Sequence, residues 1–234
     1  MASTSEVNIG AKVTNAEKIL THVQSFAGYA PADASLSVVA LTTLIASIKA
    51  KNSETASAIQ GYSAAVDKRQ SLFQKDPNSL IKVLSPIGAT IRSSYDKSSK
   101  EATDVSSMVI KIRGVKVKKG SKEPNSDFVS QSERSYGSMT QNFSDMITTL
   151  ENYGAKYTPA NTDIKIVTLK DKLTKLTAAN NAVTTTYGHL KENRDDRGDL
   201  YKNLTTITQR IKDAVKSQYG LKSTEYNLVK GLKV

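Results

Sequence analysis

The sequence of this chain repeats itself, and this internal repeat is the feature that most restricts its fold. With an offset of 128 residues, 29–33 matches 157–161, because both segments read Tyr-x-Pro-Ala followed by Asp or Asn. Downstream the offset falls to 124, which pairs 80–101 with 204–225. A third block follows with an offset of 117. Three matching blocks in the same order predict an internally duplicated chain.

The last block closes both copies of the repeat. It pairs Ile-Arg-Gly-Val-Lys-Val at 112–117 with Val-Lys-Gly-Leu-Lys-Val at 229–234. We therefore expect helical repeat 1 at 1–117, a basic and polar linker at 118–130, and helical repeat 2 at 131–234.

A long helix is predicted in the middle of each repeat, because apolar residues recur there at alternating steps of three and four. In repeat 1 the series is Val38, Leu41, Ile45, Ile48, Asn52, Thr55, Ile59, Tyr62, Val66, Arg69 and Phe73. In repeat 2 it is Ile166, Leu169, Leu173, Leu176, Asn180, Val183, Tyr187, Leu190, Arg194, Arg197 and Tyr201. Such spacing is typical of a coiled-coil seam, and about 40 residues would form a helix of roughly 60 Å.

A shorter apolar helix is expected before each long helix and another after it. In repeat 1 the segment Asp76–Ser79 reads as a turn before the third helix, whereas repeat 2 has only Gly198 there, and we expect a kink. The expected fold is all-α, an internally duplicated long antiparallel helical bundle of two three-helix units. The two units either share one bundle or form two separate three-helix bundles in tandem.

Each repeat is expected to end in a short extended segment, because β-branched and basic residues alternate there around a glycine. The residues concerned are Ile112, Gly114, Val115, Val117, Val229, Gly231, Leu232 and Val234. An extended segment has unpaired backbone donors and acceptors, so 110–117 and 227–234 are candidate association elements within or between molecules. The alternative is that their apolar residues pack onto the end of the bundle.

The C-terminal segment contains a distinctive pattern of residues. It reads Tyr219-Gly220-x-x-Ser223-x-Glu225-Tyr226-x-x-Val229-Lys230-Gly231, with Arg197 and Leu200-Tyr201 upstream. This tail resembles that of uncharacterised bacterial helical-bundle proteins common in Bacteroidetes. The resemblance covers the second half of the chain better than the first, where Asp96 stands in place of the glycine. It implies a helical fold and brings no assigned activity with it.

Catalytic constellations are missing from the sequence, so we expect a non-enzymatic protein that needs no cofactor. The chain has no cysteine, which excludes thiolate nucleophiles and cysteine-based zinc sites. It has no glycine-rich phosphate loop, and its two histidines stand in dissimilar positions, which argues against a catalytic triad. His189 and Glu192 are one helical turn apart, but Gly61 stands opposite His189 in repeat 1, so no metal site is expected.

Polar residues recur in the repeat as well. They are Asp67 and Arg69, matched by Asp195 and Arg197, and Asn52, matched by Asn180. We expect each arginine to pair with a carboxylate across the bundle through its planar fork; recognition of an anionic partner is the alternative. A single asparagine in an apolar seam fixes register at a cost in stability, which is the expected role of both asparagines.

The chain is basic, with a formal net charge of +11 from 33 basic and 22 acidic residues. Six cations lie close together before the first acidic residue of the linker: Lys111, Arg113, Lys116, Lys118, Lys119 and Lys122. This run is a candidate contact for the phosphates of nucleic acid or another polyanion. It lacks interleaved aromatic residues and a helix-turn-helix pattern, so a solvated linker is the alternative.

The duplication, the long seams and the missing catalytic site favour a structural or self-associating protein that forms a homo-oligomer or a larger assembly. Nucleic-acid or polyanion binding is the alternative function, and a membrane-active bundle is disfavoured because no apolar hairpin is visible. The longest strongly apolar stretch, 36–48, is too short for a membrane helix of about 20 residues. The N-terminal residues show no signal-peptide pattern, which favours a cytoplasmic location.

Overall fold

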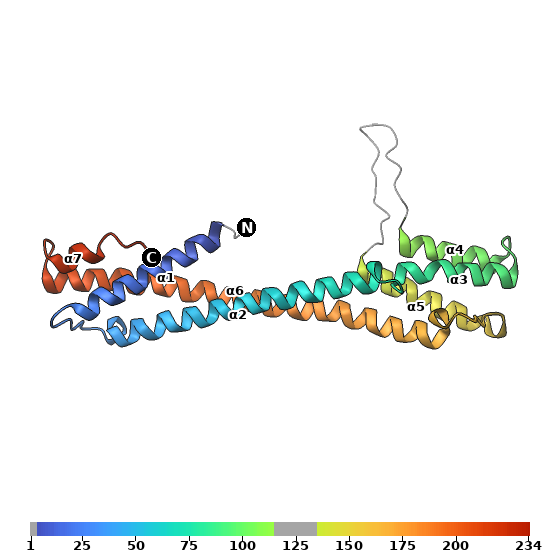
Figure 1. Cartoon of the computed structure of the whole chain (residues 1–234), viewed down its shortest axis with the longest axis horizontal. Helices are drawn as coiled ribbons and strands as arrows, with labels where there is room; N and C mark the ends of the chain where they lie inside the picture. Colours follow the sequence, from blue (N-terminus) through green and yellow to red (C-terminus); the bar gives the residue numbers. More distant parts are fainter. Residues whose placement is uncertain (1–3, 115–134) are drawn as a thin grey trace, which may run out of the picture. The chain divides into compact units, whose positions relative to one another are not determined.

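The computed structural model describes residues 4–114 and 135–234, with side chains from residue 9 onward. Seven α-helices and no strand occur in these ranges (Figure 1): α1 (Thr4–Ser25), α2 (Val38–Gln70), α3 (Leu80–Tyr95), α4 (Lys100–Arg113), α5 (Tyr136–Asn152), α6 (Ile166–Tyr219) and α7 (Thr224–Val229). Short helices lie between them: η1 (Ala34–Leu36), η2 (Ser71–Lys75), η3 (Gly154–Lys156) and η4 (Thr162–Ile164). The all-α class expected from the apolar spacing is confirmed. Within the same ranges, no helix combines the length and apolar character needed to cross a bilayer.

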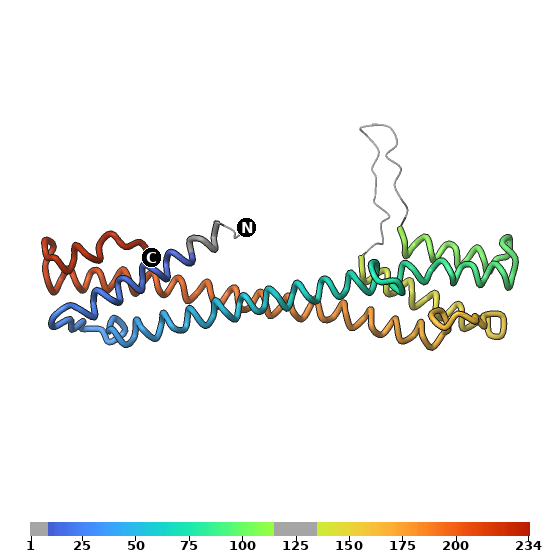
Figure 2. Tube along the Cα trace, in the orientation of Figure 1, coloured from blue at the N-terminus to red at the C-terminus, as the bar shows by residue number. Residues whose placement is uncertain are grey.

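Two compact units make up this structure. The terminal unit combines residues 1–61 with 187–234, and the middle unit contains 62–186. Both α2 and α6 pass from one unit into the other as unbroken helices, as the trace in Figure 2 shows. Each compact unit therefore contains parts of both sequence repeats, and its boundaries do not follow those expected at 117 and 131.

The terminal unit consists of α1, the first part of α2, the last part of α6, and α7. The chain turns back after α1, and an ion pair of 2.5 Å between Glu17 and Lys49 joins α1 to α2. One apolar core unites the unit, and its buried members are Ala16, Ile19, Val23, Phe26, Leu36, Leu41, Ile45, Ile48, Tyr201, Leu204, Ile211, Val215 and Val229. Leu41, Ile45 and Ile48 follow the three-four spacing, so the seam read from the sequence is the buried face of α2 here.

The middle unit packs α3, α4 and α5 with the end of α2 and the first part of α6. Helix α4 lies against both α3 and α5. The buried core is formed by Phe73, Leu80, Val83, Leu84, Ile87, Ile91, Ala102, Val105, Ile112, Met139, Phe143, Met146, Ile147, Leu150, Tyr157, Ile164, Leu169 and Leu176. Burial of one large aliphatic side chain stabilises a fold by about 1.5–3 kcal/mol, so this cluster is the main source of the unit's stability.

The junction after the long helix differs between the two repeats. In repeat 1 the chain leaves α2 through η2, a π-helical turn, and then turns at Asp76–Ser79 before α3, as predicted. Pro77 has no N–H to donate, and its ring clashes with a preceding helical turn. In repeat 2, α6 continues through Gly198 as one helix of 54 residues. Glycine costs a helix only about 1 kcal/mol relative to alanine, so it does not force a loop.

The extended conformation expected at the repeat ends is wrong at Ile112 and Val229, which are helical. Ile112 lies in the last turn of α4, and Val229 is the last residue of α7. The residues that follow Val229 form a turn and a short irregular tail. Val115 and Val117 lie outside the described residues.

Helix caps explain why the chain is helical at 100–113. The hydroxyl of Ser99 accepts a hydrogen bond from the N–H of Ala102 at the start of α4. At the end of α4, Gly114 adopts a φ of 71°, a left-handed value that glycine reaches without strain, and its N–H donates to the carbonyl of Ile110. The buried Val105 and Ile112 are seven residues apart, which is a helical repeat distance. The alternation over six residues fits both a strand and a helix end, so the shorter pattern was misleading.

The division of both repeats between the two units leads to a prediction about chain cleavage. If the chain is cut between Gly120 and Ser121 by way of an inserted protease site, we expect the fragments to stay together. Each fragment supplies part of the core of both units, so separation would expose apolar surface in both. Size-exclusion chromatography and circular dichroism of the cleaved protein should match those of the intact chain. Separation of the fragments without denaturant would contradict this arrangement.

Candidate interaction sites

An asparagine amide marks a polar position inside each compact unit. In the terminal unit, Nδ2 of Asn52 on α2 donates to the hydroxyl of Tyr201 on α6 over 2.9 Å. In the middle unit, Nδ2 of Asn180 on α6 donates to Oγ1 of Thr140 on α5 over 3.1 Å, and to the carbonyl of Tyr136 over 3.4 Å. Both Oδ1 atoms are buried without a hydrogen-bond partner among the described groups. A buried, unpaired acceptor costs about 1–3 kcal/mol, so neither position is optimised for stability alone.

In the middle unit, a stack of side chains surrounds this position. The guanidinium carbon of Arg69 lies 4.2 Å from the ring centroid of Tyr136, and the ring of Phe73 meets Tyr136 edge-on at 4.8 Å. Arg69 forms no ion pair within the described ranges, and its Nε is buried without a partner. The carboxylate pairing expected for Arg69 is therefore wrong. The ring face carries partial negative charge and takes the place of the carboxylate.

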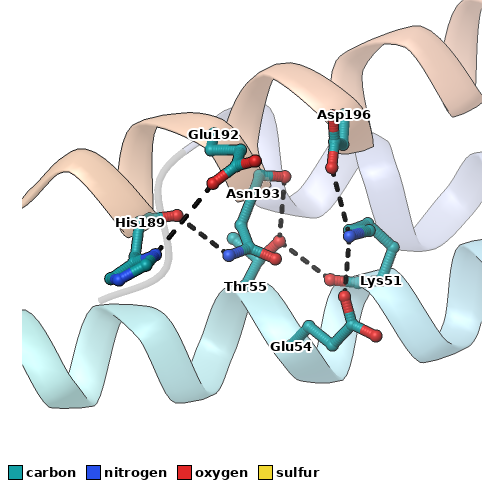
Figure 3. A network of polar contacts seen from close by, with 7 residues as sticks. All are labelled: Lys51, Glu54, Thr55, His189, Glu192, Asn193 and Asp196. Atoms are coloured by element: carbon teal, nitrogen blue, oxygen red, sulfur yellow. Dashed lines mark hydrogen bonds and ion pairs between the residues drawn. The ribbon is translucent and has the colours of Figure 1, made fainter. Parts of the chain in front are cut away.

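A polar network links α2 and α6 in the terminal unit, as Figure 3 shows. Lys51 reaches Glu54 at 2.7 Å and Asp196 at 3.2 Å, and these contacts raise its pKa. Thr55 is fully buried and donates its hydroxyl hydrogen to the carbonyl of Lys51. Asn193 of α6 accepts a longer contact of 3.4 Å from Thr55 through its carbonyl. The network fixes one helix against the other, although exposed ion pairs of this kind contribute only about 0–1 kcal/mol.

His189 and Glu192 lie at the edge of this network (Figure 3). Their side chains are 4.0 Å apart and mostly exposed. Within the described ranges, no group of three or more potential metal ligands occurs. A metal ion held by two exposed side chains would keep most of its water, which makes this pair a surface contact.

A tyrosine supports the loop before each long helix; Tyr29 is half-buried and Tyr157 is buried. Tyr29 donates its hydroxyl hydrogen to the carbonyl of Leu36 over 3.0 Å, and Tyr157 donates to the carbonyl of Ile164 over 2.8 Å. Burial, with a smaller effect of Tyr219, raises the pKa of Tyr29 to about 12, and burial also raises the pKa of Tyr157. Both therefore remain donors at neutral pH. The repeated Tyr-x-Pro pattern pointed to a helix start, but nothing in it revealed this hydrogen bond.

The same loops carry matching helix caps. The side chain of Asp33 accepts from the N–H of Ser35 over 2.8 Å, and that of Asn161 accepts from the N–H of Asp163 over 2.9 Å. Asp33 also pairs with Arg210 of α6 at 2.5 Å. The hydrogen bonds from Ser35, and then that from Arg210, lower the pKa of Asp33 to about 2.

Side chains of α6 hold the loop of the terminal unit further. Nε2 of Gln218 donates to the carbonyl of Gly28 over 2.5 Å, while its Oε1 accepts from the N–H of Ala30 over 3.2 Å. The hydroxyl of Tyr219 donates to the carbonyl of Ala27 over 3.0 Å. Beside these contacts lies an open groove of about 500 Å³ whose charged lining residues are Asp33, Arg210 and Asp213, and of these Asp33 and Arg210 pair with each other.

The basic run is only partly visible in the structure. Lys111 lies exposed in the last turn of α4, where a cation interacts favourably with the helix dipole. Arg113 bends onto α3, where it donates to the hydroxyl of Ser85 over 2.5 Å and to the carbonyl of Ile81 over 3.5 Å. The remaining members, Lys116, Lys118, Lys119 and Lys122, lie outside the described residues. Of these two cations, Arg113 is held by hydrogen bonds to α3, whereas Lys111 is exposed.

The described residues of the expected association segments are used inside the chain. Ile112 and Val229 are fully buried in the cores of the middle and terminal units. Leu232 and Val234 pack against the core of the terminal unit. Lys212 and Asn15 donate to the last two carbonyls before the C-terminal residue, those of Leu232 and Lys233, over 2.5 and 2.7 Å. This tail therefore presents little unpaired backbone to a second strand, in line with packing onto the bundle.

Comparison with family models, curated proteins and solved structures finds no match to this chain.

The ion pair of Asp33 gives a prediction about pH. Asp33→Asn keeps a cap of the kind found at Asn161 and removes the charge that pairs with Arg210. Because the folded-state pKa lies below the unfolded value, the ion pair stabilises the protein above about pH 4, and this contribution disappears as pH falls toward 2. We expect the melting temperature of the variant to lie below that of the unaltered chain at pH 6, and the two to converge near pH 2. A constant difference across this range would rule out the ion pair as its source.

The burial of Ile112 gives a second prediction. Ile112→Ala should lower the free energy of unfolding by about 2–5 kcal/mol, because it opens a cavity in the core of the middle unit. Urea titration followed by circular dichroism measures this change. Ile110→Ala, two residues earlier and on the exposed side of α4, is the matched control and should cost far less. If Ile112→Ala instead left stability unchanged and lowered the mass in light scattering, Ile112 would serve association.

Proposed function

We propose that this protein is a non-enzymatic helical-bundle protein with a structural, self-associating role. The observation that carries the proposal is a pair of exposed valines. Val39 and Val167 are each the second residue of a long helix, and their side chains are 74% and 73% exposed. They occupy the same position in the two repeats, 128 residues apart. One lies in the terminal unit and the other in the middle unit.

The surroundings of these valines differ between the repeats, which makes their agreement informative. The position two residues before the valine is Ser37 in one copy and Lys165 in the other. The position three residues after it is Thr42 in one copy and Lys170 in the other. A solvent-exposed place at a helix start has no need of a β-branched apolar side chain, because such residues are average or poor helix formers. Single exposed apolar residues are common, but an equally exposed valine in both copies supports a role in binding.

A chain with one such contact in each unit is bivalent. A second copy offers the same surfaces, so contacts between copies can close into a symmetric oligomer or continue into a longer assembly. Each contact on its own is small, and two contacts on one chain strengthen each other through effective concentration. Two binding surfaces on one chain favour a structural role in an assembly over the binding of a single ligand.

The proposal predicts a graded response to substitution. Val39→Asp and Val167→Asp each remove one contact, and aspartate is well tolerated in the first turn of a helix, so folding should be kept. We expect multi-angle light scattering to show assemblies that grow with concentration for the unaltered chain. Each single variant should stop at small oligomers, and the double variant should be monomeric.

Leu221→Asp is the matched control for these variants. Leu221 is 61% exposed, and its counterpart at an offset of 124 is Lys97, so the repeat does not preserve it. The control should assemble like the unaltered chain. The self-association proposal fails if the unaltered chain is monomeric at every concentration, or if the control and the double variant behave alike.

Polyanion binding is the second candidate function, supported by the charge of the α3–α4 hairpin. Residues 80–113 contain six cations and three acids, and Lys82, Arg92 and Lys111 are exposed. Titration with duplex DNA at rising salt tests this candidate, because phosphate contacts give an affinity that falls steeply with salt. Affinity that does not change with salt would exclude it.

A further inference from the structure

The groove of the terminal unit is open, mainly apolar and already formed. Its walls come from the loop before α2 and from the last turns of α6, and its volume is about 500 Å³. The apolar residues that line it are Ala30, Pro31, Ala32, Leu36 and Ala214. The ion pair between Asp33 and Arg210 and the two hydrogen bonds of Gln218 join one wall to the other. A partner that binds here therefore meets a surface that needs little further ordering.

One charge in the lining of this groove has no ion pair. The carboxylate of Asp213 is exposed, and among the described residues it forms no ion pair or hydrogen bond. It attracts the neighbouring Lys212 only over a longer distance, and Lys212 itself donates to the carbonyl of Leu232. Asp33 and Arg210 neutralise each other, so the lining carries one net negative charge. The groove therefore favours an apolar side chain with a cation beside it.

The exposed valine of the middle unit has this combination of groups. Val167 is 73% exposed, and Lys165 is exposed two residues before it. Among the described residues, the side chain of Lys165 forms no ion pair or hydrogen bond. Lys170, three residues after Val167, is already in an ion pair with α5, and the nearby acid Asp163 attracts Lys172. Lys165 is thus the cation that a partner of Val167 would meet.

The two repeats differ in charge at these surfaces in a complementary way. At the offset of 128, Lys165 corresponds to Ser37, so the valine of the terminal unit has no such cation. At the offset of 124, Asp213 corresponds to Ala89, so the middle unit has no such acid. The extra cation lies beside the valine of one unit, and the extra acid lies in the groove of the other. This pairing of opposite charges favours Val167 over the valine of the terminal unit as the occupant of the groove.

We propose that this groove receives Val167 of a second copy of the chain, with Lys165 of that copy beside Asp213. The inference rests on the self-association proposed above and names the surface that one of its two contacts uses. Val167 lies in the first turn of α6 and Asp213 near its end, and the two ends of one unbroken helix do not meet, so the contact joins different copies. It is heterologous, which means that each copy uses its groove toward one neighbour and its valine toward another. The space suffices for a valine and part of its neighbours, because a cavity of about 150 Å³ already holds a benzene ring.

Charge reversal on both sides of the contact tests the pairing. The parent for this test is Val39→Asp, which keeps only the contact of Val167, and sedimentation equilibrium gives its dissociation constant. In this parent, Asp213→Lys and Lys165→Asp should each weaken association by about threefold to tenfold, because each places like charges opposite each other. A chain with both reversals should regain the affinity of the parent. The reversed charges then attract each other across the contact, whereas two unrelated faults would add.

Two further variants make the test specific. Asp195→Lys is the matched control, because it makes the same charge change at an exposed position of α6 outside the groove. It should leave the dissociation constant of the parent unchanged. Ser217 is exposed on α6 and lines the groove, so Ser217→Trp fills the space without entering the core. This variant should abolish association of the parent while circular dichroism stays unchanged.

The outcomes separate this inference from the proposed function. Rescue by the double reversal, together with loss of association in Ser217→Trp, supports docking of a second copy in the groove. If the double reversal associates no better than either single reversal, or if Ser217→Trp associates like the parent, the groove is not the receiving surface, although self-association stands. The same holds if the Val39→Asp parent is monomeric while the unaltered chain associates. If the unaltered chain is monomeric at every concentration, both proposals fail.

Discussion

Burial of the apolar seams of α2 and α6 is the constraint on which the rest of this structure depends. Each of these helices contributes to two cores, because each passes from one compact unit into the other. In the terminal unit, α2 shares a core with α1, and α6 shares the same core with α7. In the middle unit, the end of α2 lies in a core with α3, and the first part of α6 lies in that core with α5. Neither sequence repeat completes a core alone, so the hydrophobic effect couples the two repeats more tightly than the linker between them does.

Each unit contains the asparagine of one repeat and an aromatic residue of the other. Asn52 of repeat 1 bonds to Tyr201 of repeat 2, while Asn180 of repeat 2 lies in the unit that holds Phe73 of repeat 1. Phe73 and Tyr201 are themselves related by the offset of 128. The two units therefore use residues from matching positions of the sequence repeat, with the two repeats exchanged.

The sequence predicted the helices well where their apolar residues continue for many turns. Leu41, Ile45 and Ile48 keep the spacing of a helix over two successive steps, of four and of three residues, and Pro77 marked a true break. The segment around Ile112 was misread because six residues cannot separate a period of two from one of 3.5, and because the cap at Ser99 lies too far upstream to belong to the motif. For the polar sites, the sequence predicted which residues recur but not which partners they contact. That Arg69 would stack on Tyr136 depends on which helices become neighbours, and tertiary packing, not local pattern, decides this.

The two units differ mainly in their polar contacts, at the loop before the long helix and beside the asparagine. The terminal unit holds its loop with Arg210, Gln218 and Tyr219; at an offset of 124 only the tyrosine is kept, as Tyr95, which packs on Tyr153 as Tyr219 packs on Phe26. The middle unit instead fills the space beside its asparagine with Tyr136. A stack of that kind adds roughly 0.5–2 kcal/mol. The terminal unit relies instead on the hydrogen bonds of Gln218 and the ion pair of Arg210 with Asp33, so the two units are stabilised by different polar contacts beside their apolar cores.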